Sequence, residues 1–163
     1  MIVLQSATAL QPQISLDHIS ADQALKLGTQ FSTIDPWANY QDTPARLTAY
    51  FAAHDDAAAR YAVLCGDDLA GAVVVRHGWL RGPYVQFLGV LPEFQGRAIG
   101  SAILAWFETT ARAAGERNLW IAVSDFNPGA RRLYERHGFR VLAEIEHLFR
   151  DGTSELLLRK TLF

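Results

Sequence analysis

Residues 90–101 read Val90-Leu91-Pro92-Glu93-Phe94-Gln95-Gly96-Arg97-Ala98-Ile99-Gly100-Ser101, and they join an apolar strand to an amphipathic helix through a turn of small residues. The first turn of a helix leaves several backbone N–H groups without partners, and the positive end of the helix dipole lies at the same point. An anion can therefore bind in front of such a turn. We interpret residues 95–101 as a cradle for a phosphate group.

This turn has other interpretations besides a phosphate cradle. Strand-to-helix turns that contain glycine are common, so a purely structural turn is the alternative. The spacing is neither that of a dinucleotide-binding Gly-x-Gly-x-x-Gly motif nor that of a lysine-terminated P-loop. The phosphate interpretation therefore depends on a second signal later in the chain.

A second motif, Asn127-Pro128-Gly129-Ala130-Arg131-Arg132-Leu133-Tyr134-Glu135-Arg136-His137-Gly138-Phe139, comes after the length of one helix and one strand. Together the two motifs resemble the GNAT superfamily of N-acetyltransferases. The pyrophosphate loop of that superfamily is usually written Gln/Arg-x-x-Gly-x-Gly/Ala, and here it takes the form Gln95-Gly96-Arg97-Ala98-Ile99-Gly100. The resemblance implies that the anion is the pyrophosphate of acetyl-CoA, which would serve as a co-substrate.

One residue departs from the superfamily pattern, because Ala98 stands where the first motif glycine is usual. Its Cβ restricts the backbone and crowds an incoming phosphate. Alanine costs little if φ is negative there. We therefore expect acetyl-CoA binding that is modest rather than lost.

The resemblance also implies where the rest of the cofactor binds. The strand around 87–90 would splay from the strand around 119–123, and the unpaired backbone would bind the pantetheine arm as an added strand does. Leu88 and Val90 would then supply main-chain contacts, Gln95 to Ser101 the phosphate contacts, and Asn127 a contact on the pantetheine side.

Tyr134 follows Asn127 by two helical turns, so both residues lie on nearly the same helix face. Periodicity alone favours a core aromatic beside Leu133. The resemblance instead implies a general acid that protonates the departing CoA thiolate, since a phenol can donate a proton without being charged. Tyr134 is our main catalytic candidate.

A neutral amine must attack the thioester, so an ammonium substrate first needs a base. Glu93, in the loop before the cradle, is one candidate, although a Pro-Glu-aromatic-Gln string more often shapes the loop. Asp125 and His147 are two further candidates for the base. The alternative interpretation of Asp125 is a turn residue, and that of His147 is an ordinary strand histidine. The choice among these three stays open.

Several aromatic residues fall in predicted loops or at strand ends, where they would line a partly apolar acceptor pocket or pack in the core. These are Trp37, Tyr40, Trp79, Tyr84 and Phe126. The five histidines show no metal-ligand spacing, so we expect no metal.

The order of elements predicts an α/β (α+β) fold of the GNAT-like acyl-CoA N-acyltransferase type, with a mixed, mostly antiparallel sheet flanked by helices. Strands are expected near 14–16, 61–65, 69–76, 84–90, 119–123, 139–147 and 153–160. Capping signals start helices at Ser20 and Thr43, and two further helices begin at the two motifs. Gly28 weakens the first helix pattern, and Gly89 suggests a bulge or the close approach of another backbone.

The chain has 163 residues and a formal charge of −2, with charges scattered along it. We expect one domain over 1–163, with 1–12 as an N-terminal extension, and no nucleic-acid or membrane partner. The lone Cys65 lies in an apolar run and is expected to be a buried hydrophobe. With no signal segment or spanning helix, the expected location is cytoplasmic.

We therefore expect an acetyl-CoA-dependent N-acetyltransferase that acts on a primary amine of a small molecule or peptide, by direct attack in a ternary complex. The alternative is a non-catalytic acyl-CoA-binding sensor or scaffold. Dimers are frequent in the superfamily, so a homodimer is an open expectation, without an interface that the sequence identifies.

Overall fold

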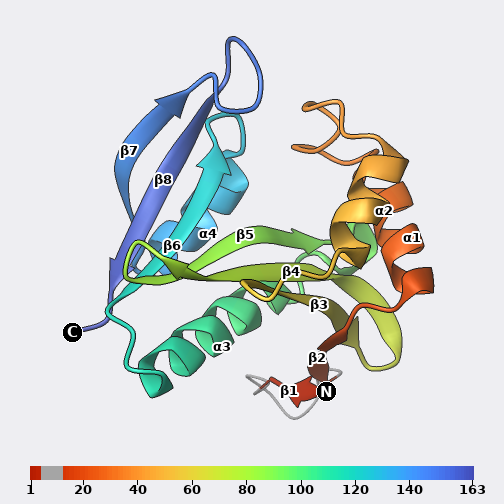
Figure 1. Ribbon diagram of the computed structural model, residues 1–163, viewed down its shortest axis with the longest axis horizontal. Coiled ribbons are helices and arrows are strands. Elements are labelled where there is room, and N and C mark those ends of the chain that lie inside the picture. The colour runs from red at the N-terminus through yellow and green to blue at the C-terminus, as the bar shows by residue number, and fades with distance from the viewer. Residues whose placement is uncertain (5–12) are drawn as a thin grey trace.

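The computed structural model describes residues 1–4 and 13–163, and its centre is one eight-stranded sheet (Figure 1). The strand order is β1-β2-β3-β4-β5-β6-β8-β7, and every neighbouring pair is antiparallel except β5–β6. The elements are β1 (Ile2–Val3), β2 (Ile14–His18), α1 (Ala21–Phe31), α2 (Pro44–Ala52), β3 (Ala58–Cys65), β4 (Asp68–Trp79), β5 (Gly82–Val90), the short 3-10 helix η1 (Pro92–Phe94), α3 (Ile99–Ala113), β6 (Asn118–Ser124), α4 (Pro128–Arg136), β7 (Arg140–Glu146) and β8 (Ser154–Thr161). The predicted mixed sheet is confirmed.

Helices cover both faces of the sheet, as predicted. On one face, α1 and α2 bury Leu27, Phe31 and Phe51 against Val74 and Phe87. On the other face, α3 and α4 pack on the apolar residues of β4, β6 and β8. The two clusters are separated by the sheet itself, which is the layered arrangement expected when each helix buries one apolar stripe.

The predicted helix starts are confirmed at both N-terminal helices. Ser20 accepts a hydrogen bond from the Gln23 N–H, while the Gln23 side chain accepts one from the Ser20 N–H, which completes a capping box. Thr43 caps α2, and Pro44 occupies its first turn. Local side-chain chemistry therefore sets where these helices begin.

Gly28 does not interrupt α1. The neighbouring helix α2 lies so close that it requires a residue without a side chain at this position. A Cβ at Gly28 would lie 2.2 Å from the Thr48 Oγ1 and 2.8 Å from the Pro44 carbonyl oxygen. The helix runs on to Phe31. Gly28 thus allows the close crossing of α1 and α2.

The expected close approach of another backbone is present at Gly89, because a Cβ on Gly71 of β4 would lie 2.1 Å from the Gly89 carbonyl oxygen. A side chain of α1 is close as well, since a Cβ at Gly89 would meet the ring of Phe31 at 2.6 Å. The bulge of β5 lies instead at Gln86, because Val74 pairs with Phe87 while Val75 pairs with Val85. The bulge turns Gln86 to an exposed position beside β6.

The N-terminal extension is only partly described. Its Ile2 and Val3 pair with Leu16 and Ser15 of β2, whereas residues 5–12 lie outside the described part of the chain. Cys65 is buried, as expected. Within residues 1–4 and 13–163, no helix combines the length and the apolar character that crossing a membrane requires.

Candidate active site

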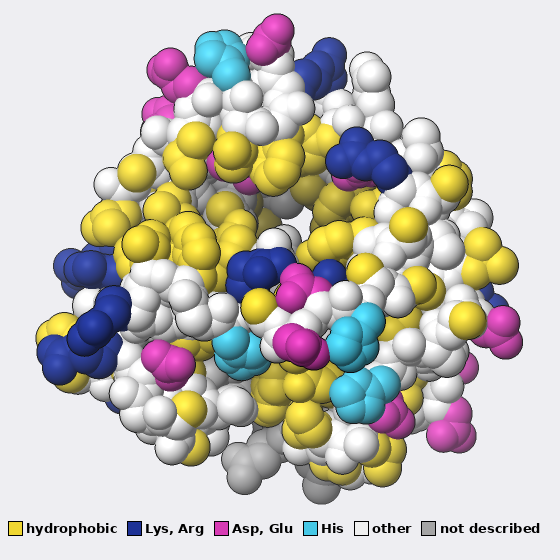
Figure 2. Space-filling model, viewed as in Figure 1, with side chains coloured by type: hydrophobic (Ala, Val, Ile, Leu, Met, Phe, Trp, Pro, Cys, Tyr) yellow, Lys and Arg dark blue, Asp and Glu magenta, His cyan; other side chains and the backbone are white. Residues whose placement is uncertain are grey.

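A cleft of about 410 Å³ opens where β5 and β6 separate. The two strands pair only through Tyr84 with Trp120 and Val85 with Ile121. Beyond these two positions the strands diverge, and the cleft lies between residues 86–88 of β5 and 122–124 of β6. The splay that the resemblance implied is therefore present. Figure 2 shows the hollow on this face, bordered by hydrophobic side chains.

Tyr134 reaches the cleft from α4. Its side chain is only 6% exposed, yet it lines the cleft and packs edge-on against Phe139, with ring centroids 6.3 Å apart. Burial raises the pKa of the Tyr134 phenol well above its ordinary value, and the neighbouring Tyr84 and Glu155 add to this effect. The hydroxyl therefore stays protonated at neutral pH and is available as a proton donor.

Asn127 lies at the same wall of the cleft and also shapes it. Its Oδ1 accepts a hydrogen bond of 3.1 Å from the Ala130 N–H, which caps α4. Its own N–H donates to the Ser124 carbonyl at 2.9 Å, which ties the start of α4 to the end of β6. Asn127 thus has a structural role in addition to any contact with a ligand.

The start of α3 has the form expected of an anion cradle. The first intrahelical bond joins the Ala102 N–H to the Ala98 carbonyl at 3.0 Å, so the N–H groups of residues 99–101 have no partner within the helix. No side chain caps α3 within the described residues. A Cβ at Gly100 would meet Leu133 Cδ2 at 3.0 Å, so this glycine also brings α3 and α4 close together.

Ala98 does not adopt the negative φ under which alanine would cost little. Its φ is +59° and its ψ is 13°, which is the left-handed region. Gly96, two residues earlier, has a φ of +75°. Turns built this way direct successive N–H groups toward one side. The local geometry of a glycine motif is therefore retained at Ala98, at the cost of strain on an L-residue.

The remaining expected cofactor residues are distributed along β5 and the loop that follows η1. Leu88 lines the cleft, whereas Val90 is not among its lining residues. The Val90 carbonyl accepts a 3.0 Å hydrogen bond from Gln95 Nε2, which fastens the loop to the end of β5. Arg97 donates to the Glu93 carbonyl at 2.9 Å and lies over the Phe94 ring. These contacts stabilise the conformation of the loop between β5 and α3.

The three base candidates lie in different places. Glu93 is exposed on η1, and its side chain is not part of the cleft wall. His147 is exposed at the β7–β8 turn, where its Nδ1 accepts from the Gly152 N–H at 3.0 Å. Asp125 follows β6, and its Oδ2 accepts from the Ser154 N–H at 3.3 Å. Of the three, only Asp125 lies near the end of β6 that borders the cleft.

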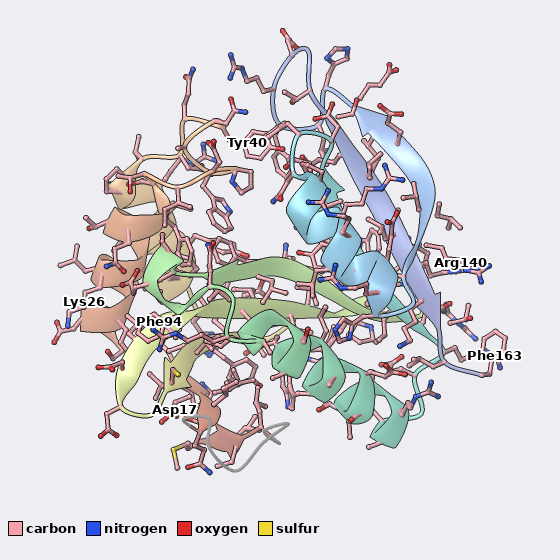
Figure 3. All side chains as sticks on the ribbon, turned by 180° about the vertical axis from the view of Figure 1, so that it is seen from behind. Asp17, Lys26, Tyr40, Phe94, Arg140 and Phe163 are labelled. Atoms are coloured by element: carbon pink, nitrogen blue, oxygen red, sulfur yellow. The ribbon has the colours of Figure 1, made fainter. Side chains whose placement is uncertain are left out.

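Sequence reasoning missed Glu155, a carboxylate on the cleft wall. It pairs in register with Ser124 of β6, and it is only 5% exposed. Tyr40 donates a hydrogen bond to Glu155 from the loop between α1 and α2. Figure 3 shows the labelled Tyr40 between that loop and the C-terminal strands. The only signal for Glu155 in the sequence was a charged residue in an apolar strand. The face of the sheet on which Glu155 lies depends on how β8 pairs with β6.

Three of the five expected pocket aromatics line the cleft, namely Trp37, Tyr40 and Tyr84. Trp37 stacks on Phe87, with ring centroids 4.5 Å apart, so it also belongs to the core. Phe126 supports Tyr40 edge-on at 5.5 Å. Trp79 packs on Trp120 outside the cleft wall. Among the described residues, no group of three or more His, Cys, Asp or Glu side chains could hold a metal ion.

A mixed sheet that splits at its one parallel pair, with a helix starting beside the opening, defines the acyl-CoA N-acyltransferase fold. The model of the acetyltransferase (GNAT) family matches residues 24–139, and the chain belongs to this family. Streptothricin acetyltransferase from Streptomyces lavendulae is 30% identical over 104 residues, which are 62% of this chain and 55% of that protein. The chain thus spans about half the length of this curated relative.

Solved structures agree with this assignment. An acetyltransferase from Thermus thermophilus superimposes with a TM-score of 0.73 at 18% identity, over 91% of this chain and 97% of that one. A GNAT family acetyltransferase from Elizabethkingia anophelis, solved with acetyl-CoA bound, gives a TM-score of 0.60 at 19% identity, over 65% of this chain and 77% of that one. At these identities the likeness concerns the fold.

Proposed function

We propose that this protein is an acetyl-CoA-dependent N-acetyltransferase that transfers an acetyl group to a primary amine of a small molecule or peptide. The observation that carries the proposal is the cleft between β5 and β6, which places the Tyr134 phenol beside unpaired strand backbone. Membership in the acetyltransferase family supports the same reaction class. The buried thiol of Cys65 fits a reducing compartment, and we propose the cytoplasm.

Acetyl-CoA is the proposed co-substrate, and the separated strands offer a place for it. Its pantetheine arm would hydrogen-bond the backbone of β5 near Leu88 and Val90, as an added strand does. Its pyrophosphate would meet the N–H groups at the start of α3, over residues 96–101. Asn127 would contact the opposite side of the arm. A structural neighbour solved with acetyl-CoA bound supports acetyl-CoA as the co-substrate.

The proposed reaction is direct attack, without an acyl-enzyme intermediate. The amine nitrogen bonds to the thioester carbonyl carbon, the C–S bond breaks, and sulfur takes the phenolic proton of Tyr134. A phenol is protonated at neutral pH before the step, and Tyr134 can donate its proton as negative charge grows on sulfur. The products are an N-acetylated amine and CoA.

The substitution Tyr134→Phe tests this proposal. We expect kcat to fall by about a hundredfold or more, because a general acid contributes about 10²–10⁴ in rate. The affinity for acetyl-CoA, measured by calorimetry, is expected to stay within a few-fold of wild type. Tyr61→Phe is the matched control, since Tyr61 packs on Trp106 away from the cleft and should keep full activity.

Release of the free CoA thiol with a panel of primary amines is the measurement. Steady turnover that Tyr134→Phe abolishes supports the enzyme. Tight acetyl-CoA binding without turnover by the wild-type protein would instead indicate the non-catalytic sensor or scaffold.

A further inference from the structure

Glu155 is a buried carboxylate for which the described part of the chain supplies no positively charged partner within 4.0 Å. A carboxylate of this kind is costly to bury unless a cation or several hydrogen bonds compensate it. The described hydrogen bonds come from neutral side chains, with Tyr40 as the donor and Ser124 beside it. A cation that binds in the cleft would therefore supply the compensating positive charge that the described side chains do not.

On this basis, and resting on the proposed N-acetyltransferase activity, we propose that Glu155 is the general base for the acceptor amine. The acceptor is then a primary amine that enters as an ammonium ion and carries no anionic group near its nitrogen. This assigns to Glu155 the role that the sequence left open among Glu93, Asp125 and His147.

The charges around Glu155 favour a cation. Three phenols line the same cleft as Glu155 from separate elements: Tyr40 before α2, Tyr84 on β5 and Tyr134 on α4. Asp125 acts on it from the end of β6 with a like charge. Asp42 also lines the cleft, and it is paired with the only cleft-lining basic side chain of the described residues, Arg46, at 3.3 Å. An ammonium ion would be the first unpaired positive charge at this wall.

Burial raises the pKa of Glu155, and the negative charge of Asp125 adds to the rise, while the hydrogen bonds from Tyr40 and Ser124 oppose it. A base becomes more effective as its pKa approaches the working pH. Glu155 is thus better suited to accept a proton from an ammonium ion than a carboxylate on the surface.

The aromatic residues that line the cleft further define the class of acceptor. Trp37, Tyr40, Tyr84 and Phe149 line the same cleft as Glu155. Aromatic faces attract cations and pack against flat or apolar bodies. A cationic amine on an apolar body therefore matches the walls, whereas an acceptor with a phosphonate or carboxylate next to the amine meets Glu155 and Asp125 with a like charge.

The protons balance in this scheme. The ammonium ion gives one proton to Glu155, and the neutral amine then forms the C–N bond. When the C–S bond breaks, sulfur takes the proton of Tyr134. The nitrogen loses its second proton to the Tyr134 phenolate through water, and Glu155 releases its proton to solvent. The products are the amide, the CoA thiol and one proton.

The test compares Glu155→Gln with wild type in the rate of CoA release over a pH series. In wild type, kcat/KM should rise with pH through a midpoint above the ordinary range of carboxyl groups, because Glu155 must be deprotonated. Glu155→Gln should lose about a hundredfold or more of kcat and lose this midpoint. Glu155→Asp keeps a carboxylate and should recover part of both, while Glu146→Gln, at an exposed position of β7, is the neutral control.

Acetyl-CoA binding by calorimetry separates this inference from the proposed function. A wild-type protein that neither binds acetyl-CoA nor turns over would defeat both. A wild-type protein that turns over, with Glu155→Gln matching its rate and pH profile, would overturn the inference alone. The acceptor class is tested with phenethylamine, putrescine and aminomethylphosphonate, and preference for the phosphonate would contradict it.

Discussion

At the scale of single residues, Ala98 shows how a motif can be kept by geometry rather than by residue type. Its backbone is left-handed, with a φ of +59°, and it precedes α3 without a capping side chain. An L-residue in this region costs roughly 1–2 kcal/mol relative to the right-handed form. The neighbouring Ile99 is buried and anchors the helix below the turn. Packing of α3 therefore holds Ala98 in a conformation that it does not prefer.

Ala98→Gly should stabilise the protein by about 0.5–1 kcal/mol in the free energy of unfolding, since relief of strain exceeds the extra entropy of the unfolded glycine. Urea unfolding followed by circular dichroism measures this. Acetyl-CoA should bind at least as well, because a Cβ is removed from the cradle.

The matched control is Ala105→Gly, at an exposed position inside α3. Glycine there costs about 1 kcal/mol, so the two substitutions should act in opposite directions. Markedly weaker acetyl-CoA binding by Ala98→Gly would contradict the idea that the methyl group crowds the phosphate.

At the scale of elements, α2 and the loop that follows α1 form one side of the cleft, and α2 crosses α1 closely. Gly28 faces Thr48 and Pro44 with no space for a side chain. The Thr48 hydroxyl is buried and has no hydrogen-bond partner among the described residues. The two helices carry Phe31 and Phe51, which pack on Phe87 of β5 at centroid distances of 5.1 and 4.9 Å. Their spacing therefore positions the loop that holds Tyr40.

Gly28→Ala should destabilise the protein by about 1–3 kcal/mol, because the added methyl group overpacks the crossing. Thermal unfolding is the measurement, and KM for the amine is expected to rise because the Tyr40 loop shifts. Lys26→Ala, on the exposed side of α1, serves as the control and should change stability by no more than about 0.5 kcal/mol. An unchanged melting temperature for Gly28→Ala would show that the helices can separate without cost.

At the scale of the whole molecule, two parts of the sheet meet at only two register positions of β5 and β6. They are connected across the rim of the cleft by Arg150, which donates to the Asn39 carbonyl and to its Oδ1, each at 3.0 Å. Beneath the sheet, Arg112 of α3 donates to the Leu162 carbonyl at 2.6 Å. Hydrogen bonds at the rim and beneath the sheet thus connect the parts of the molecule that border the cleft.

Acetyl-CoA should protect these edges from hydrogen exchange. With the ligand at about a hundredfold excess over its Kd, amide exchange in residues 86–90, 99–101 and 122–124 should slow by up to about a hundredfold. Amides in the β2–β3 pair lie away from the cleft and should be unaffected by direct contact. Protection spread evenly over the sheet, or absent from β5, would argue against binding as an added strand.

Much of the fold is set by local patterns. The caps at Ser20 and Thr43 and the cap at Asn127 place three helix starts correctly, because each uses side-chain oxygens close in sequence. Strand boundaries were less accurate: β4 extends to Trp79, past the predicted end, because the long hairpin with β5 continues the ladder.

The sequence by itself determined the order of the main elements, the glycine-containing turn before α3 and the placement of Tyr134 two turns after Asn127, since these depend on contacts within a few residues. Only the tertiary structure decided that Ala98 is left-handed, that Gly28 serves a helix crossing, and that Glu155 faces the cleft beside Tyr40. Tyr40 and Glu155 are 115 positions apart in the chain. No local pattern brings such groups together, because strand register and helix packing are set by the burial of the whole core.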